Sequence, residues 1–136
     1  MKGGVVFVDT SAWYAAVVAD DPNYADATRW LRANRAALLT TDYVVDEVLT
    51  LLKARGQYRR ALELGEGLFS GDVAVLYSAT PADIRSAWQI FQRFSDKAWS
   101  FTDCVSKEVM ANLDIGMAFA FDEHFHQFAT VRVVPG

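Results

Sequence analysis

The chain has 136 residues, with 13 Lys and Arg against 17 Asp and Glu, a net charge of −4 and a hydrophobic fraction of 52%. This length fits one domain with a substantial core, and no apolar run approaches the roughly 18 residues of a membrane-spanning helix. The acidic balance argues against binding nucleic acid by overall charge, and a single cysteine, Cys104, excludes an internal disulfide and suits the reducing cytoplasm, where we expect the protein.

Short apolar runs alternate with amphipathic segments along the whole chain. In chain order the patterns predict a strand at 4–9, helices at 11–18 and 21–35, a strand at 36–41, helices at 42–56 and 57–71, a strand at 73–78, helices at 81–95 and 102–114, and strands at 116–122 and 130–135. This alternation predicts an α/β fold in which a parallel five-stranded sheet carries helices on both faces. No Pro/Gly/Ser-rich linker interrupts it, so residues 1–136 are expected to form one domain.

Three acids lie at expected strand and helix ends. Asp9 ends the first strand, Asp122 ends the fourth, and Asp103 opens the helix before the fourth strand. Each of them could simply cap a helix, because a carboxylate accepts hydrogen bonds from the free N–H groups there. However, the carboxyl ends of parallel strands meet at one edge of a sheet, where ligands bind. One cluster of acids at this edge would account for all three.

Glu47 lies in the middle of a helix and cannot be a cap. At roughly 100° per residue it borders the apolar side of its helix, whereas Asp46 points toward solvent. That apolar side consists of Val44, Val48, Leu51 and Leu52. A carboxylate beside the core needs a partner, a shifted pKa or a metal ion. Carboxylates that converge select hard ions, and we therefore expect Mg²⁺ or Mn²⁺.

Other chemistries find less support in the residues. His124 and His126 lie on opposite sides of a short segment and, with one distant cysteine, make a poor zinc site; Phe125 and Phe128 are expected to anchor that segment in the core. Cys104 is expected to be a buried hydrophobic residue. No dinucleotide-binding, P-loop or serine-hydrolase motif is present. A receiver domain would need an early acidic pair, and a haloacid-dehalogenase-like phosphatase a second acid at the position of Ser11.

Four stretches together resemble the PIN domain, and in particular the VapC-type ribonuclease toxins of toxin–antitoxin pairs: FVDTSAW, DYVVDEVLTLL, SFTDCVSKEVM and AFAFDEHF. The resemblance covers nearly the whole chain and implies an endoribonuclease that depends on Mg²⁺ or Mn²⁺. It assigns catalytic roles to Asp9, Glu47, Asp103 and Asp122. Asp9 and Asp103 would bind the metal most directly, and Glu47 and Asp122 through water or a second ion. The hydroxyls of Thr10 and Ser11 would orient Asp9.

The chain departs from similar sequences in two places. Lys107 and Glu108 stand where apolar residues usually follow, and HFHQFATVRVVPG lacks the usual small-residue turn. Neither place contains a candidate ligand, so the departures concern partner surfaces and strand spacing. A PIN-shaped module that binds RNA or protein without cutting is the alternative, although it would have no use for four mutually repelling acids.

The expected partners are RNA, a small antitoxin and a second copy of the chain. Seven of the thirteen basic residues lie between residues 29 and 60, either as phosphate or acidic-peptide contacts or as ordinary solvated helix faces. We expect phosphate contacts from Lys53, Arg55, Arg59 and Arg60. A homodimer is expected because one core can hardly enclose every aromatic side chain. The four tryptophans are Trp13, Trp30, Trp88 and Trp99.

Overall fold

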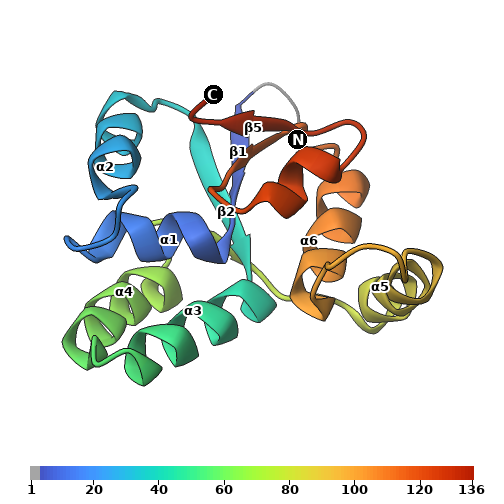
Figure 1. Cartoon of the computed structure of the whole chain (residues 1–136), viewed down its shortest axis with the longest axis horizontal. Helices are drawn as coiled ribbons and strands as arrows, with labels where there is room; N and C mark the ends of the chain where they lie inside the picture. The colour runs from blue at the N-terminus through green and yellow to red at the C-terminus, as the bar shows by residue number, and fades with distance from the viewer. Residues whose placement is uncertain (1–3) are drawn as a thin grey trace.

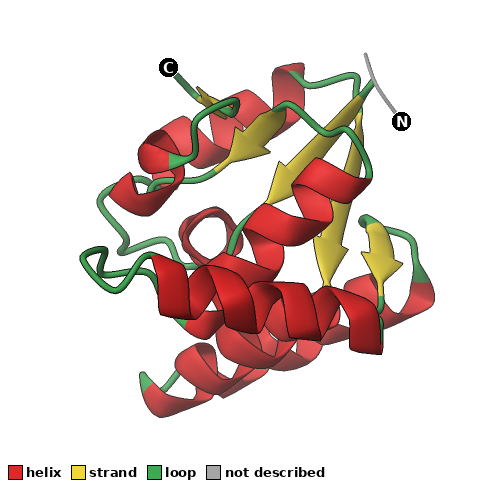
Figure 2. Ribbon diagram, turned by 90° about the vertical axis from the view of Figure 1, so that its right-hand side faces the viewer, coloured by secondary structure: helices red, strands yellow, loops and turns green. Residues whose placement is uncertain are grey.

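The computed structural model describes residues 4–136 and contains one sheet of five parallel strands, in the order β3-β2-β1-β4-β5. The arrows of the strands accordingly run the same way (Figure 2). The strands are β1 (Val5–Val8), β2 (Ala37–Thr41), β3 (Val75–Tyr77), β4 (Met117–Phe119) and β5 (Arg132–Val134). The expected α/β architecture is confirmed.

Six α-helices and one 3₁₀ helix surround the sheet within the described range, with α1 and α2 on one side and α6 on the other (Figure 1). The helices are α1 (Thr10–Val17), α2 (Tyr24–Ala33), α3 (Asp42–Ala54), α4 (Tyr58–Ser70), α5 (Pro81–Arg93), α6 (Phe101–Asn112) and the 3₁₀ helix η1 (Glu123–Gln127). None of them is long and apolar enough to cross a membrane.

The core lies on both faces of the central strand β1. Val6, Phe7 and Val8 are at most 2% exposed, because helices cover the strand from both sides and leave no polar face. Phe125 and Phe128 are buried as expected, and the Phe125 ring stacks on Phe7. Cys104 is also buried, as predicted.

Two predicted boundaries differ most from the structure. α2 begins at Tyr24 with Asn23 as its N-cap, because the Asp21 carboxylate accepts a hydrogen bond from the Asn23 N–H and forms a turn before the helix. β4 ends at Phe119, so Asp122 does not end a strand. The chain leaves the sheet after Phe119, and Asp122 instead caps η1.

Candidate active site

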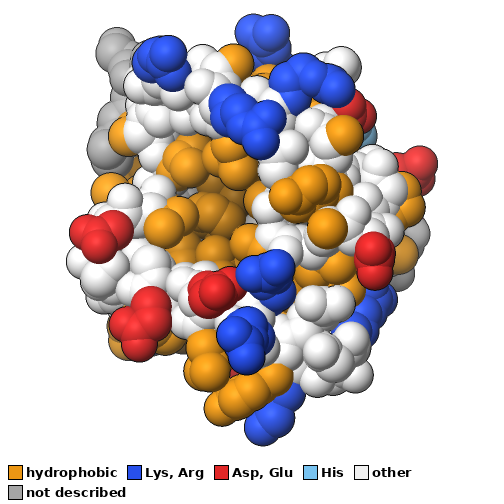
Figure 3. All heavy atoms as spheres, turned by 90° about the vertical axis from the view of Figure 1, so that its left-hand side faces the viewer, with side chains coloured by type: hydrophobic (Ala, Val, Ile, Leu, Met, Phe, Trp, Pro, Cys, Tyr) orange, Lys and Arg blue, Asp and Glu red, His pale blue; other side chains and the backbone are white. Residues whose placement is uncertain are grey.

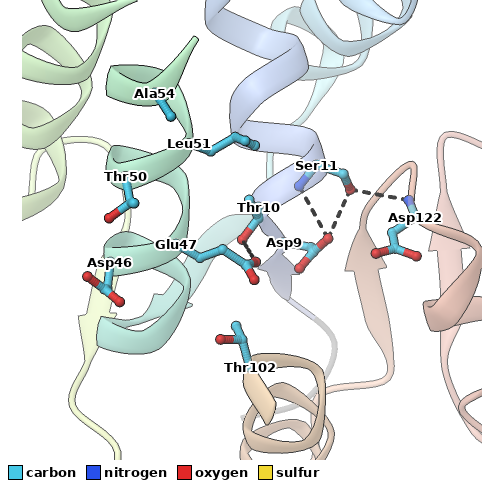
Figure 4. A pocket seen from close by; sticks show the side chains of 10 residues that line it. All are labelled: Asp9, Thr10, Ser11, Asp46, Glu47, Thr50, Leu51, Ala54, Thr102 and Asp122. Carbon is cyan, nitrogen blue, oxygen red and sulfur yellow. Dashed lines mark hydrogen bonds between the residues drawn. The ribbon is translucent and has the colours of Figure 1, made fainter. Parts of the chain in front are cut away.

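Asp9 connects the end of β1 to the first turn of α1. Its Oδ2 accepts hydrogen bonds from the Ser11 N–H at 3.2 Å and the Ser11 hydroxyl at 2.9 Å (Figure 4). Its Oδ1 has no hydrogen-bond partner within the described part of the chain, although the residue is only 2% exposed. Burial raises the pKa of Asp9 to about 7, and the charge of Asp103 adds to this effect. The site therefore contains a carboxylate oxygen that lacks a positive partner.

Glu47 reaches the same place from α3. Its Oε1 accepts a hydrogen bond from the Thr10 hydroxyl at 2.5 Å. Glu47 is half-buried and points toward Asp9, whereas Asp46 is exposed on the outer side of the helix, as the helical phase predicts (Figure 4). Burial is the main cause that raises the pKa of Glu47, and the charges of Asp103 and Asp122 also contribute.

Asp103 enters the site from the first turn of α6. The Ser100 hydroxyl accepts a hydrogen bond from the Asp103 N–H, and Asp103 Oδ2 accepts one from the Ser100 N–H, both at 3.0 Å. The acid is 4% exposed. This reciprocal cap fixes the carboxylate at a helix N-terminus, where the free N–H groups favour negative charge. Asp103 therefore caps its helix and belongs to the acidic cluster at the same time.

Asp122 joins the cluster from the loop between β4 and η1. Its Oδ1 accepts a hydrogen bond from the His124 N–H at 2.9 Å, and its own N–H donates to the Ser11 hydroxyl at 3.2 Å. The same hydroxyl accepts the Phe121 N–H at 2.9 Å and donates to Asp9. Ser11 thus holds Asp9 and the Asp122 loop together. The expectation that Ser11 orients Asp9 is confirmed, but the Thr10 hydroxyl binds Glu47 instead.

His124 is the site residue that sequence reasoning missed. Its Nδ1 lies 2.8 Å from Asp103 Oδ2 and 3.2 Å from Asp122 Oδ1. Burial alone would lower the pKa of His124, but the hydrogen bond to Asp103 and the surrounding negative charges raise it. His126, by contrast, is exposed. The available signal was spacing, because His124 comes two residues after a candidate acid and a helical turn folds its side chain back.

One group among the described residues brings metal-ligating atoms close together. It consists of Asp103, Asp122 and His124, with one ligand atom from each lying within 4.8 Å of the others. Asp9 and Glu47 lie next to this group and interact electrostatically with Asp103. Most of these ligand atoms are oxygens, and the carboxylates repel one another unless a cation lies between them. Together with the unpartnered Asp9 oxygen, this suits a hard divalent cation.

A pocket of about 620 Å³ opens in front of the acids. It is lined by Asp9, Thr10, Ser11, Asp46, Glu47, Thr50, Leu51, Ala54, Thr102 and Asp122 (Figure 4).

The basic residues expected to bind phosphate do not line this pocket. Lys53 lies over the Tyr58 ring, Arg55 over the Tyr14 ring, and Arg60 pairs with Glu63. They lie at the end of α3 and the start of α4.

The Cys104 thiol takes no part in this site. It lies in α6, and burial, with a smaller contribution from Asp103, raises its pKa to about 11. A thiol with this pKa stays protonated at neutral pH and is a poor nucleophile.

The chain is similar to known proteins over nearly its whole length. The 23S rRNA-specific endonuclease VapC20 of Mycobacterium tuberculosis is 33% identical over 132 residues, which are 96% of this chain and 99% of that protein. The crystal structure of M. tuberculosis VapC20, described as a sarcin–ricin loop cleaving toxin, has a TM-score of 0.87 at 29% identity and covers 93% of this chain and 96% of its own.

A second solved structure shares the fold alone. VapBC2 from Rickettsia felis, bound to a DNA fragment from its promoter, has a TM-score of 0.66 at 7% identity and covers 95% of this chain and 96% of its own. The family model of the PIN domain matches residues 6–131. With this match over nearly its full length, the chain belongs to the PIN domain family.

Proposed function

We propose that this protein is a metal-dependent endoribonuclease and the toxin of a toxin–antitoxin pair. The observation that carries the proposal is the convergence of Glu47, Asp103 and Asp122 on Asp9, whose buried Oδ1 has no hydrogen-bond partner among residues 4–136. The similarity to VapC20, an rRNA endonuclease by name, supports the same reaction class.

Asp9, Glu47, Asp103 and Asp122 are the proposed catalytic acids. Asp9 and Asp103 would hold Mg²⁺ or Mn²⁺ most directly, and Glu47 and Asp122 would act through water or a second ion. A metal ion in this place would supply positive charge for the scissile phosphate and would lower the pKa of a water that could serve as the nucleophile. Ser11 keeps Asp9 and the Asp122 loop in register, and Thr10 holds Glu47 through its hydroxyl.

RNA is the proposed substrate, and the cytoplasm, where RNA is abundant, is the proposed location. Lys53, Arg55, Arg59 and Arg60 remain the candidates for phosphate contacts. All four are exposed beside the pocket wall that α3 forms. Their ring and ion-pair contacts leave the charges at the surface, where phosphates could reach them.

A small antitoxin is the proposed inhibitor. The face that carries α1, α2 and α4 has an apolar hollow with Lys and Arg side chains above and below it (Figure 3). A peptide with apolar and acidic side chains complements such a surface in both hydrophobicity and charge. Arrest of growth on expression of this gene alone, and relief by the neighbouring small gene, is the expected result; unaffected growth would contradict the toxin proposal.

A homodimer is proposed because of two exposed aromatic side chains on α5, and not because of the number of tryptophans. Trp13 and Trp99 are buried, and Trp30 packs its ring 4.4 Å from Phe119, so the core encloses most of these rings. Trp88 and Phe91 on α5 remain 52% and 41% exposed and stack on each other. Light scattering should give twice the 15.1 kDa chain mass, and Trp88→Ala should reduce it; a 15.1 kDa species alone would exclude the dimer.

The test of the reaction is RNA cleavage by purified protein with and without Mg²⁺ or Mn²⁺. Asp103→Asn should lower the cleavage rate by roughly tenfold or more, because it removes one ligand charge at nearly constant shape. Glu47→Gln should do the same, and Asp46→Asn is its matched control, since the exposed Asp46 side chain at the pocket points away from Asp9 (Figure 4). If metal-loaded wild-type protein binds RNA but leaves it intact, the non-catalytic alternative is correct.

A further inference from the structure

The imidazole of His124 faces the carboxylates of Asp103 and Asp122 from η1, the turn that follows Asp122. The His124 N–H donates to Asp122 Oδ1 at 2.9 Å, and this turn of η1 directs the side chain back toward α6. Nδ1 then lies 2.8 Å from Asp103 Oδ2 and 3.2 Å from Asp122 Oδ1. The side chain is 28% exposed, so solvent reaches part of it.

These distances suit three ligands of one ion. In an octahedral site with bonds of about 2.1 Å, neighbouring ligand atoms lie about 3.0 Å apart. The two Nδ1-to-oxygen distances, 2.8 and 3.2 Å, fall on either side of this value. One ligand atom from each of the three residues lies within 4.8 Å of the others, which leaves them close enough to share one ion.

A separate observation indicates that a cation belongs beside this group. Asp9 Oδ1 is buried, has no hydrogen-bond partner in the described range and lies beside the pocket (Figure 4). Asp9 also interacts electrostatically with both Asp103 and His124. A buried carboxylate oxygen without a donor is costly unless a positive charge approaches it.

We infer that His124 is a direct ligand of the proposed metal ion beside Asp103, that Asp122 on the other side of the imidazole also binds the ion directly, and that the nitrogen makes the site prefer Mn²⁺ to Mg²⁺. This inference rests on the proposed function, since it concerns the same metal site. Mg²⁺ prefers oxygen ligands and gives up its waters reluctantly, whereas first-row transition ions accept imidazole nitrogen more readily. Replacing the imidazole should therefore weaken Mn²⁺ binding more than Mg²⁺ binding.

The experiment uses the full-length protein without RNA and measures Mn²⁺ by pulsed electron paramagnetic resonance and calorimetry. Wild-type protein should show ¹⁴N coupling to bound Mn²⁺, and His124→Ala should lose it. The Mg²⁺ concentration that displaces half of the Mn²⁺ should fall by roughly tenfold in the variant. His126→Ala is the matched control, since this exposed histidine is two residues away, and it should keep both properties.

The outcomes separate the inference from the proposed function. Bound Mn²⁺ without ¹⁴N coupling in the wild-type protein overturns the inference, because His124 is then only a hydrogen-bond donor, while metal-dependent RNA cleavage still supports the proposed function. Loss of the coupling in His126→Ala also overturns it. Binding of neither ion overturns both. If His124→Ala does not fold, the wild-type spectrum and His126→Ala decide the question.

Discussion

Two buried carboxylates in different parts of the molecule have opposite environments. Asp9, at the end of β1, is 2% exposed, and Asp83, in the first turn of α5, is 3% exposed. Asp83 accepts hydrogen bonds from the Tyr77 hydroxyl at 2.7 Å, the Thr80 N–H at 2.9 Å and the Asn112 amide at 2.9 Å. The Asp9 carboxylate accepts its hydrogen bonds through Oδ2, and its Oδ1 has no partner in the part of the chain that the structure describes.

The pKa values of the two acids move in opposite directions. Burial would raise the pKa of Asp83, but the hydrogen bonds from Tyr77, Thr80 and Asn112 outweigh burial and lower it. For Asp9 burial dominates, and the pKa rises to about 7. Equal burial therefore does not identify a functional acid. The unpartnered oxygen does, because it leaves a charge for a ligand to compensate.

Activity should separate the two acids by the largest effect. Asp9→Asn should lower metal-dependent RNA cleavage by at least about a hundredfold, because it removes charge at the centre of the site. Asp83→Asn should leave the rate per folded molecule nearly unchanged. Initial rates at saturating Mg²⁺ test this difference, after circular dichroism has shown that both variants are folded. Equal losses in the two variants would mean that Asp9 acts only through the fold.

For the stability of the fold, the loss of Asp83 should matter more than the loss of Asp9. Asp83→Ala should lower the free energy of unfolding by about 2 kcal/mol, because it removes the charged acceptor that joins donors from β3, the start of α5 and α6. Urea denaturation in metal-free buffer at neutral pH measures this loss. Ala82, the exposed preceding residue, provides the control, since Ala82→Ser should change the value by less than about 0.5 kcal/mol.

The pH dependence of stability should have opposite signs at the two sites. Asp9 has a pKa of about 7 in the folded protein against 3.8 for the ordinary carboxyl, so its contribution is present below about pH 4 and is lost as the pH rises toward 7. Without metal, Asp9→Asn should therefore be more stable than wild type by about 2 kcal/mol at pH 8, with no advantage at pH 4. Asp83 contributes above its unfolded pKa, and that contribution fades in acid. Denaturation curves at the two pH values decide the matter.

The smallest expected effect concerns the hydroxyl that links Asp9 to Asp122. Ser11→Ala should weaken Mn²⁺ binding by roughly tenfold without changing the number of bound ions, because both carboxylates lose orientation but keep their charge. Calorimetry measures the affinity. Ser106→Ala, a change at another buried hydroxyl, should leave it unchanged.

Local patterns were enough to predict the sheet and the positions of the acids. The strands are short apolar runs, and the inward direction of Glu47 follows from helical phase alone. Asp9, Asp103 and Asp122 could be identified because helix N-termini attract acids and parallel strands bring these ends together. What could not be predicted depends on contacts between distant segments.

His124 and Asp83 show where sequence reasoning stops. The path of η1 turns His124 inward and His126 outward, and the spacing of His124 after Asp122 gains meaning only once the fold brings Asp103 on α6 beside it. Asp83 looks like any first-turn acid until Asn112, 29 residues later, supplies its third partner. The enclosure of Trp13 and Trp99 likewise follows from tertiary packing, which the count of aromatic residues does not report.

The placement of β4 has a consequence for the order in which the protein is made. β4 pairs with β1, the earliest strand, and the loop that follows it carries Asp122 and His124. A growing polypeptide that has not reached residue 117 possesses Asp9, Glu47 and Asp103 but cannot close the edge at which they meet. Under the proposed function, the polypeptide must therefore be synthesised past His124 before it can cleave RNA, and a shorter nascent chain is inactive.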